Sequence, residues 1–241
     1  MTYTRSAAWY DVLYGMKDYA RESQGVHAMI TQHKRSTGNT LLDVACGTGR
    51  HLEFLREWYA IKGLDLEAGL LESARERCPG VEFVVGDMTQ FDLGEQFDVV
   101  TCLFSAIGYV RTVDRLGLAI QHMANHVKPG GVLIVEPWFE CATWNVGRIH
   151  ANFIDQPDLK IARMNISEIR GSAAEGWYSR NDMHFLVATP QGVEHFVERH
   201  DLGLFEVEQY LAAFTASGLE PIHDPQGITG RGMYIGKRGA G

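Results

Sequence analysis

The sequence predicts an α/β fold, in which helices cover both faces of a mainly parallel sheet and an antiparallel meander is inserted late in the chain. Up to Glu136, short apolar runs alternate with stretches of helical periodicity. The runs are apolar on both faces, which is typical of a parallel sheet covered by helices. After Glu136, longer stretches alternate polar and apolar residues, which indicates antiparallel strands with one face in water.

The elements of the main sheet follow from local signals. Leu52 and Leu55 share one face of a predicted helix, and Pro79-Gly80 ends the next one. The predicted strands cover residues 40–45, 60–65, 81–85, 97–103, 132–136 and 232–236. The predicted helices cover residues 51–58, 68–77, 116–126 and 206–217.

The meander is predicted as strands over residues 160–170, 177–189 and 193–204, separated by turns at Gly171 and Gly192. By parity, His195 and His200 fall on opposite faces of the last strand. We find no linker of low complexity. We therefore expect a single domain over residues 1–241, with a core at about 20–140 and 205–241 and an insertion at about 150–204.

Composition excludes several classes of function. A net charge of −8 and a pI near 5.7 argue against nucleic acid and anionic membranes as partners. The four cysteines form no C-x-x-C pair, and residues 1–6 carry no apolar leader, so we expect a reduced, cytoplasmic protein with no membrane span. His122 and His126 have a spacing that zinc could use, but no third ligand is evident, and we expect no metal.

The glycine-rich segment 43–49 (DVACGTG) lies between the first strand and the first helix, at the sheet edge where α/β folds bind ligands. Counted from Gly47, the third residue is Gly49 but the sixth is Leu52, so the dinucleotide fingerprint fails. No G-K-[ST] follows, so a P-loop fails as well. A tight turn at a helix N-terminus suits a carboxylate or a nucleoside instead.

Acidic residues follow the next two strands. Asp65 ends the second strand, where a carboxylate can accept both ribose hydroxyls. Asp87 and Met88 follow the third strand, where an aspartate can take an adenine amino group and a methionine can pack on the ring. The alternative is that each glycine only closes a turn and each aspartate only caps a helix.

These marks, together with K-P-G-G at residues 128–131, resemble those of class I S-adenosylmethionine-dependent methyltransferases, which have a Rossmann-like sheet. The resemblance implies S-adenosylmethionine as cofactor and S-adenosylhomocysteine as product. The cofactor-binding residues that we expect are Tyr10, Tyr19, Ala45, Gly47, Gly49, Asp65, Leu66, Asp87, Met88 and Leu103.

A narrower resemblance runs nearly end to end. The segments 41–49, 104–109 (FSAIGY), 135–138 (VEPW), 183–185 (MHF), 212–216 and 230–232 (GRG) resemble those of the bacterial N,N-dimethyltransferases that finish desosamine and mycaminose. The resemblance implies dimethylation of the amino group of a dTDP-linked deoxyaminosugar. Ala106 and Phe139 depart from the family's usual F-S-S and E-P-W-W segments, which bears on the identity of the hexose.

The same resemblance implies substrate contacts. Tyr3, Tyr10 and Tyr19 match three N-terminal tyrosines that lie over the family's active site, and Arg231 matches an arginine that holds the nucleotide phosphates. Tyr109 follows the fourth strand, and we expect it to orient the amine by a hydrogen bond rather than to abstract its proton, because a phenol is a poor base near neutral pH.

Three further residues complete the predicted substrate site. Trp138, at the end of the fifth strand, can wall the pocket, and Arg163 and Arg180 on the meander can reach a diphosphate. The uncovered meander predicts a homodimer surface. Two alternatives remain: a class I methyltransferase for another small-molecule amine or hydroxyl, and a binding protein of the same fold that has lost turnover.

Overall fold

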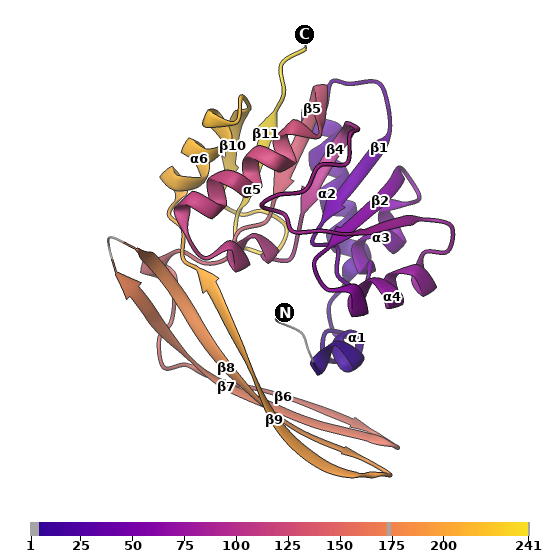
Figure 1. Cartoon of the computed structure of the whole chain (residues 1–241), viewed down its shortest axis with the longest axis vertical. Coiled ribbons are helices and arrows are strands. Elements are labelled where there is room, and N and C mark those ends of the chain that lie inside the picture. Colours follow the sequence, from indigo (N-terminus) through magenta and orange to yellow (C-terminus); the bar gives the residue numbers. More distant parts are fainter. Residues whose placement is uncertain (1–4, 173–174, 241) are drawn as a thin grey trace.

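The computed structural model describes residues 5–172 and 175–240, which form two sheets (Figure 1). The main sheet has the order β10-β11-β5-β4-β1-β2-β3. Its parallel strands are β1 (Thr40–Val44), β2 (Ala60–Asp65), β3 (Glu82–Val85), β4 (Phe97–Cys102) and β5 (Val127–Val135). At one edge, β11 (Met233–Lys237) runs antiparallel to β5, and β10 (Glu220–Asp224) runs antiparallel to β11.

Helices cover both faces of the main sheet, as the sequence predicts. Helices α2 (Tyr19–His33), α3 (Arg50–Leu55) and α4 (Ala68–Arg77) pack on one face, and α5 (Val113–Asn125) and α6 (Val207–Ala216) on the other. Neighbouring side chains of β1 point to opposite faces of the sheet: Leu41 packs with the core under α2, α3 and α4, and Leu42 packs with the core under α5 and α6. The two cores explain why the run is apolar at consecutive positions. Because both faces of the strand are buried, most of its side chains are apolar; the exception is Asp43, whose buried carboxylate accepts the Thr101 hydroxyl.

The helices begin and end at recognisable signals. Helix α5 is capped at its N-terminus by Thr112, whose hydroxyl oxygen accepts the backbone N–H of Arg115. Helix α2 is capped by Asp18, whose carboxylate accepts the backbone N–H of Arg21. Along α5, Leu116, Ala119, Ile120 and Met123 are fully buried, at the spacing of a single helical face.

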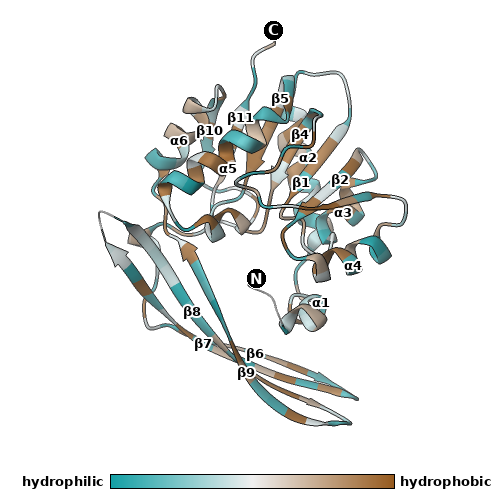
Figure 2. Cartoon of the chain, in the orientation of Figure 1, coloured by the Kyte–Doolittle hydropathy of each residue, from teal (hydrophilic) through white to brown (hydrophobic). Residues whose placement is uncertain are grey.

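The second sheet has the order β6-β7-β8-β9 and lies in chain order between β5 and α6. Its strands are β6 (Ile149–Gln156), β7 (Leu159–Ser172), β8 (Gly176–Thr189) and β9 (Gly192–Gly203), all antiparallel. It is long and curved, and polar and apolar bands alternate along it (Figure 2). Its inner face packs on the N-terminal segment, where Leu13 of α1 (Tyr10–Leu13) contacts a cluster of buried side chains.

The sequence prediction is confirmed for the fold class and incomplete in its elements. The meander has four strands rather than three, since β6 was missed; most of this strand is exposed. The last strand is preceded by β10, which is short, polar and contains Pro221, as edge strands tolerate. Helix α2 and the short N-terminal helices were also missed. The division into a core and an insertion within one domain stays a prediction.

Among the described residues, no helix is both long and apolar enough to cross a bilayer.

Candidate active site

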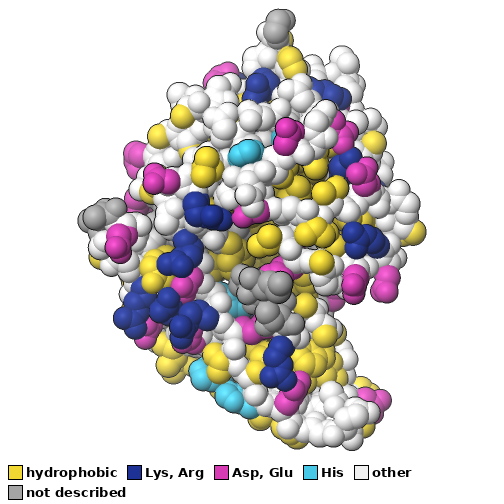
Figure 3. Space-filling model, viewed as in Figure 1, with side chains coloured by type: hydrophobic (Ala, Val, Ile, Leu, Met, Phe, Trp, Pro, Cys, Tyr) yellow, Lys and Arg dark blue, Asp and Glu magenta, His cyan; other side chains and the backbone are white. Residues whose placement is uncertain are grey.

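A cavity of about 610 Å³ lies between the carboxyl ends of the parallel strands and the inner face of the second sheet. In the space-filling view, apolar side chains gather around the hollow between the main sheet and the second sheet (Figure 3). Every residue predicted to bind the cofactor lines this cavity except Gly49. Gly49 lies behind it, with a φ of +74° at the start of α3. A Cβ there would come within 3.3 Å of the Ala74 Cβ, so the position favours glycine because it needs both a left-handed backbone and close packing.

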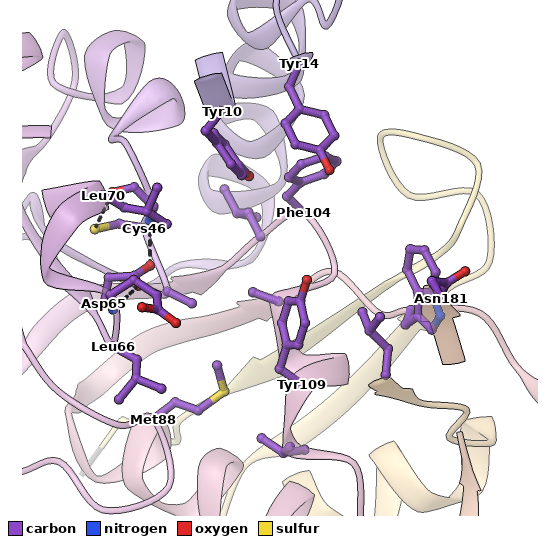
Figure 4. A pocket seen from close by; sticks show the side chains of 18 of the residues that line it. Tyr10, Tyr14, Cys46, Asp65, Leu66, Leu70, Met88, Phe104, Tyr109 and Asn181 are labelled. Atoms are coloured by element: carbon purple, nitrogen blue, oxygen red, sulfur yellow. Dashed lines mark hydrogen bonds between the residues drawn. The ribbon is translucent and has the colours of Figure 1, made fainter. Parts of the chain in front are cut away.

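Asp65 is held by the glycine-rich turn that it faces. Its Oδ2 accepts the backbone N–H of Gly47 at 2.7 Å, and its Oδ1 accepts that of Glu67 at 2.8 Å. Burial raises the pKa of Asp65, and these two hydrogen bonds oppose that rise. The carboxylate is therefore fixed in place at the end of β2, with its remaining lone pairs available to a ligand in the cavity (Figure 4).

Asp87 and its neighbours form the next part of the wall. The Asp87 Oδ1 accepts the backbone N–H and the hydroxyl of Thr89, each at 2.8 Å. Burial acts to raise the pKa of Asp87, but these bonds and Arg115 outweigh it and lower the pKa. Leu66 and Met88 lie close by in the cavity wall, beside Asp65 (Figure 4). Two fixed carboxylates beside apolar side chains match the hydroxyls and the flat ring of a nucleoside.

Aromatic residues of the N-terminal segment cover this end of the cavity. Tyr10 and Tyr14 have ring centroids 4.8 Å apart, and Tyr14 meets the edge of Phe104 at 5.3 Å. Burial raises the pKa of Tyr10 well above 10, so its phenol stays neutral. The Thr48 hydroxyl donates to Asp11 at 2.7 Å, which ties the glycine-rich turn to α1.

A buried carboxylate, Glu136, lies where β5 ends. Its Oε2 accepts the Phe104 N–H at 2.7 Å, and its Oε1 accepts the Thr229 hydroxyl at 2.6 Å and the Arg231 guanidinium at 2.8 Å. Glu136 is fully buried, whereas Arg231 also lines the cavity. The predicted phosphate-binding arginine is therefore oriented by an ion pair and faces the cavity from the loop between β10 and β11.

Cationic side chains gather on the opposite wall. Arg163 lines the cavity from β7 and donates to the Tyr14 hydroxyl at 3.2 Å. Arg148 and His150 line it too, and burial together with these two arginines lowers the pKa of His150. Together with Arg231, these arginines form a cationic cluster (Arg148, Arg163 and Arg231), which suits a ligand with several negative charges.

Arg180 does not belong to this cluster. It lies on β8, where Asn181 and Met183 line the cavity, so strand alternation turns Arg180 to the outer face. There its guanidinium binds both carboxylate oxygens of Asp201, at 2.9 and 2.8 Å. We therefore remove Arg180 from the substrate site.

Tyr109 and Trp138 both line the cavity, as their positions after β4 and β5 led us to expect. The Tyr109 hydroxyl points away from Met88, toward Phe104 and Tyr14 (Figure 4), and it forms a hydrogen bond with the Nδ1 of His200 at 2.8 Å. The Trp138 Nε1 donates to the Ser179 hydroxyl at 2.9 Å, which ties the end of β5 to the second sheet. Tyr3 lies outside the described residues.

Several cavity residues were missed by the sequence analysis. They lie on the N-terminal segment, on the turn before β6 and on the inner face of the second sheet: Tyr14, Arg148, His150, Asn165, Asn181 and Met183. Only the alternation of polar and apolar residues hinted at an inner face, and it did not say which parity points inward.

His122 and His126 make hydrogen bonds that belong to the fold. His122 Nδ1 bonds the Phe91 carbonyl oxygen at 2.8 Å, and the Nε2 of His126 accepts the Leu93 N–H at 2.9 Å. Within residues 5–172 and 175–240, no group of three or more His, Cys, Asp or Glu is placed to hold a metal ion.

Comparison with known proteins agrees with this geometry. A family model described as a methyltransferase domain matches residues 41–131. The dTDP-3-amino-3,4,6-trideoxy-alpha-D-glucopyranose N,N-dimethyltransferase of Streptomyces venezuelae is 39% identical over 231 residues, which cover 94% of this chain and 95% of that protein. The dTDP-4-amino-2,3,4,6-tetradeoxy-D-glucose N,N-dimethyltransferase of Saccharopolyspora spinosa is 37% identical, with 95% of this chain and 91% of that protein covered.

Comparison with solved structures gives matches to similar enzymes. The solved structure of an amino pentose methyltransferase from Micromonospora echinaspora, with S-adenosylmethionine bound, matches with a TM-score of 0.84 at 35% identity, and covers 95% of this chain and 96% of that one. Together with the fixed carboxylates at the ends of β2 and β3, these matches show that the chain belongs to the S-adenosylmethionine-dependent sugar N,N-dimethyltransferases.

Proposed function

We propose that this enzyme transfers two methyl groups, one after the other, to the amino group of a dTDP-linked deoxyaminosugar. The observation that carries the proposal is the polarity of the cavity. Carboxylates at the ends of β2 and β3 line one part, and the cationic cluster lines another. A neutral small-molecule amine would need no such cluster, whereas a nucleotide diphosphate is bound by guanidinium groups in a bidentate way.

The proposed mechanism asks little of side-chain chemistry. The bound cofactor supplies a methyl group that its sulfonium already activates. Asp65 would accept hydrogen bonds from the ribose hydroxyls and Asp87 would accept one from the adenine amino group, while the aromatic side chains of Tyr10 and Tyr19 would close this end of the cavity against water. Tyr109 orients the acceptor nitrogen. Fixing the reacting atoms in line lowers the barrier by about 7–11 kcal/mol in well-oriented systems.

The similar enzymes differ in the ring position of the amine that they methylate, as their names state. This chain is 39% identical to an enzyme named for a 3-amino sugar and 37% identical to one named for a 4-amino sugar. Our proposal covers both positions. The unpaired state of all four cysteines agrees with a reducing compartment, and we propose the cytoplasm as the place of action.

The direct test is to incubate the enzyme with S-adenosylmethionine and a panel of dTDP-3-amino and dTDP-4-amino sugars, and to follow products by mass spectrometry. We expect species that have gained one and then two methyl groups. Methylation of free amines or hydroxyl compounds, with every dTDP-sugar left unchanged, would support the alternative small-molecule methyltransferase instead.

Arg163 gives a test of the cationic cluster. Arg163→Gln should raise the KM for the dTDP-sugar about 10- to 150-fold, since a charge-assisted phosphate contact contributes roughly 1.5–3 kcal/mol. Its affinity for S-adenosylmethionine, measured by calorimetry, should not change. Arg180→Gln is the matched control, because it removes an arginine from the outer face of the same sheet. Equal KM values for the two variants would refute the assignment.

Asp65 tests the proposed ribose contact. Asp65→Asn keeps the shape of the side chain but removes its charge, so S-adenosylmethionine should bind about 10- to 150-fold more weakly, the equivalent of roughly 1.5–3 kcal/mol. Asp92→Asn serves as the control, because that side chain is 85% exposed and lies outside the cavity. Wild-type affinity in the Asp65 variant, by titration calorimetry, would rule out the ribose assignment.

We further propose a homodimer formed through the outer face of the second sheet. The register places apolar side chains side by side on that face, and they are strongly exposed: Ile149, Phe153, Met164, Ile166, Leu186 and Val197. Such a number of exposed apolar side chains on one face is uncommon for a monomer, and twofold symmetry would bring the same face of two subunits together.

Leu186→Arg should convert the dimer to a monomer in sedimentation velocity at micromolar concentration, because it places a charge in the apolar interface. Leu118→Arg is a closely matched control: Leu118 lies on α5, and both side chains are 49% exposed. A wild-type protein that sediments as a monomer, or a Leu186 variant that stays dimeric, would contradict the proposed interface.

A further inference from the structure

A chain of polar side chains leads from the cavity into the second sheet. The Tyr109 hydroxyl bonds His200 Nδ1 at 2.8 Å, and His200 Nε2 lies 3.9 Å from the Glu198 Oε2. Tyr109 comes from the short helix after β4, whereas His200 and Glu198 share the inner face of β9. Tyr109 lines the cavity and His200 lies behind it, fully buried. Two segments far apart in sequence therefore meet through one hydrogen bond.

The far end of this chain is held in its charged form. Glu198 accepts the backbone N–H groups of Arg5 at 2.8 Å and Ser6 at 3.0 Å, and the Ser6 hydroxyl. Burial acts to raise the pKa of Glu198, but the neighbouring His200 imidazole and the hydrogen bonds from Ser6 and Arg5 outweigh it and lower the pKa to about 2. An ionised buried carboxylate can stabilise a positive charge that forms transiently on a neighbouring imidazole, as in a Ser-His-Asp triad.

The reaction requires a group that accepts a proton from the substrate amine before each methyl transfer. An amine attacks only through its free lone pair, so an ammonium substrate must first lose a proton. The first transfer gives a methylated ammonium, which must lose a proton before the second. A phenol alone is a poor acceptor near neutral pH, but a phenol whose proton is taken by an imidazole can pass a proton on.

We propose that Tyr109, His200 and Glu198 form a relay that deprotonates the substrate amine. The ammonium N–H bond breaks as its proton moves to the Tyr109 oxygen, while the Tyr109 O–H proton moves to His200 Nδ1. The products are a neutral amine, an unchanged phenol and an imidazolium that Glu198 stabilises. The proton returns along the same path to water before the next cycle. Tyr109 touches the substrate, and His200 acts through it.

The relay predicts a specific pH dependence. Among the described residues, the titratable groups facing His200 are Tyr109 from the helix after β4 and Glu198 from β9 itself. On β8, the opposite residue Asn181 carries no charge, and the Arg5 guanidinium is directed to Glu194 and Phe196. A variant that lacks this imidazole should therefore lose most activity at low pH, where solvent deprotonates little of the amine.

The inference rests on the proposed function, so its test uses dTDP-3-amino-3,4,6-trideoxy-α-D-glucopyranose and S-adenosylmethionine as probes. His200→Gln should lower kcat at pH 7 about 100-fold, within the range of general-base effects. Its kcat should recover by about tenfold per pH unit as the pH rises, since solvent then deprotonates the amine. Cofactor affinity, measured by calorimetry, should stay unchanged.

Tyr109→Phe keeps the ring and removes the hydroxyl, so it tests the relay with less disturbance of packing. It should show the same loss and the same recovery with pH. The double variant should be no slower than either single one, because both changes break one path. His33→Gln, at the end of α2, is the control and should match the wild type.

Three results would overturn the relay: unchanged kcat in both single variants, losses that are equal at every pH, or losses that multiply in the double variant. Failure of the wild type to methylate this sugar and other dTDP-aminosugars would refute the proposed function instead, and the two failures are thereby distinguished.

Discussion

The cavity depends on the buried carboxylate of Glu136. It joins the loop after β4, the end of β5 and the loop between β10 and β11 through Phe104, Thr229 and Arg231. Phe104 and Ser105 have φ values of +53° and +61°, a conformation that costs non-glycine residues energy. The hydrogen bond from Phe104 to Glu136, and that from the Ser105 hydroxyl to the Pro137 carbonyl at 2.6 Å, offset this cost. Removing one partner of such a buried ion pair typically costs about 3–5 kcal/mol, which is why Arg163 is a cleaner probe than Arg231.

Around this fixed centre, different parts of the chain contribute different chemistry. The glycine-rich turn and the ends of β2 and β3 supply a neutral turn and two carboxylates. The second sheet and the segment before it supply cations, amides and the buried His200. The N-terminal segment completes the wall of the cavity, and the backbone N–H groups of Arg5 and Ser6 join it to Glu198 of the second sheet. In our proposal, the second sheet binds the acceptor with its inner face and a second subunit with its outer face.

The sequence predicted the part of the site built from turns and strand ends. Gly47, Asp65 and Asp87 lie at the carboxyl ends of parallel strands, where open α/β sheets bind their ligands. Their spacing was therefore enough to predict that they line the cavity. The inner face of the second sheet was harder to predict, because a shift of one residue exchanges the two faces of every strand. Arg163 and Arg180 looked equivalent in sequence, yet pairing of Arg163 with Phe185 places Arg180 on the other side.

For His200, the sequence predicted the face of the strand but not the contact that its side chain makes. Parity correctly separated it from His195, which lies on the outer face beside His184. Its link to Tyr109 joins residues 91 positions apart, and no local pattern encodes such a contact. Long-range polar contacts of this kind follow from tertiary packing alone.

The most direct measurement is a crystal structure of the enzyme with S-adenosylhomocysteine and a dTDP-aminosugar. We expect the ribose hydroxyls of the cofactor product on Asp65, the diphosphate on Arg163 and Arg231, and the sugar nitrogen within hydrogen-bond distance of the Tyr109 hydroxyl. A diphosphate bound away from the cationic cluster, or an amine that points away from Tyr109, would contradict our account.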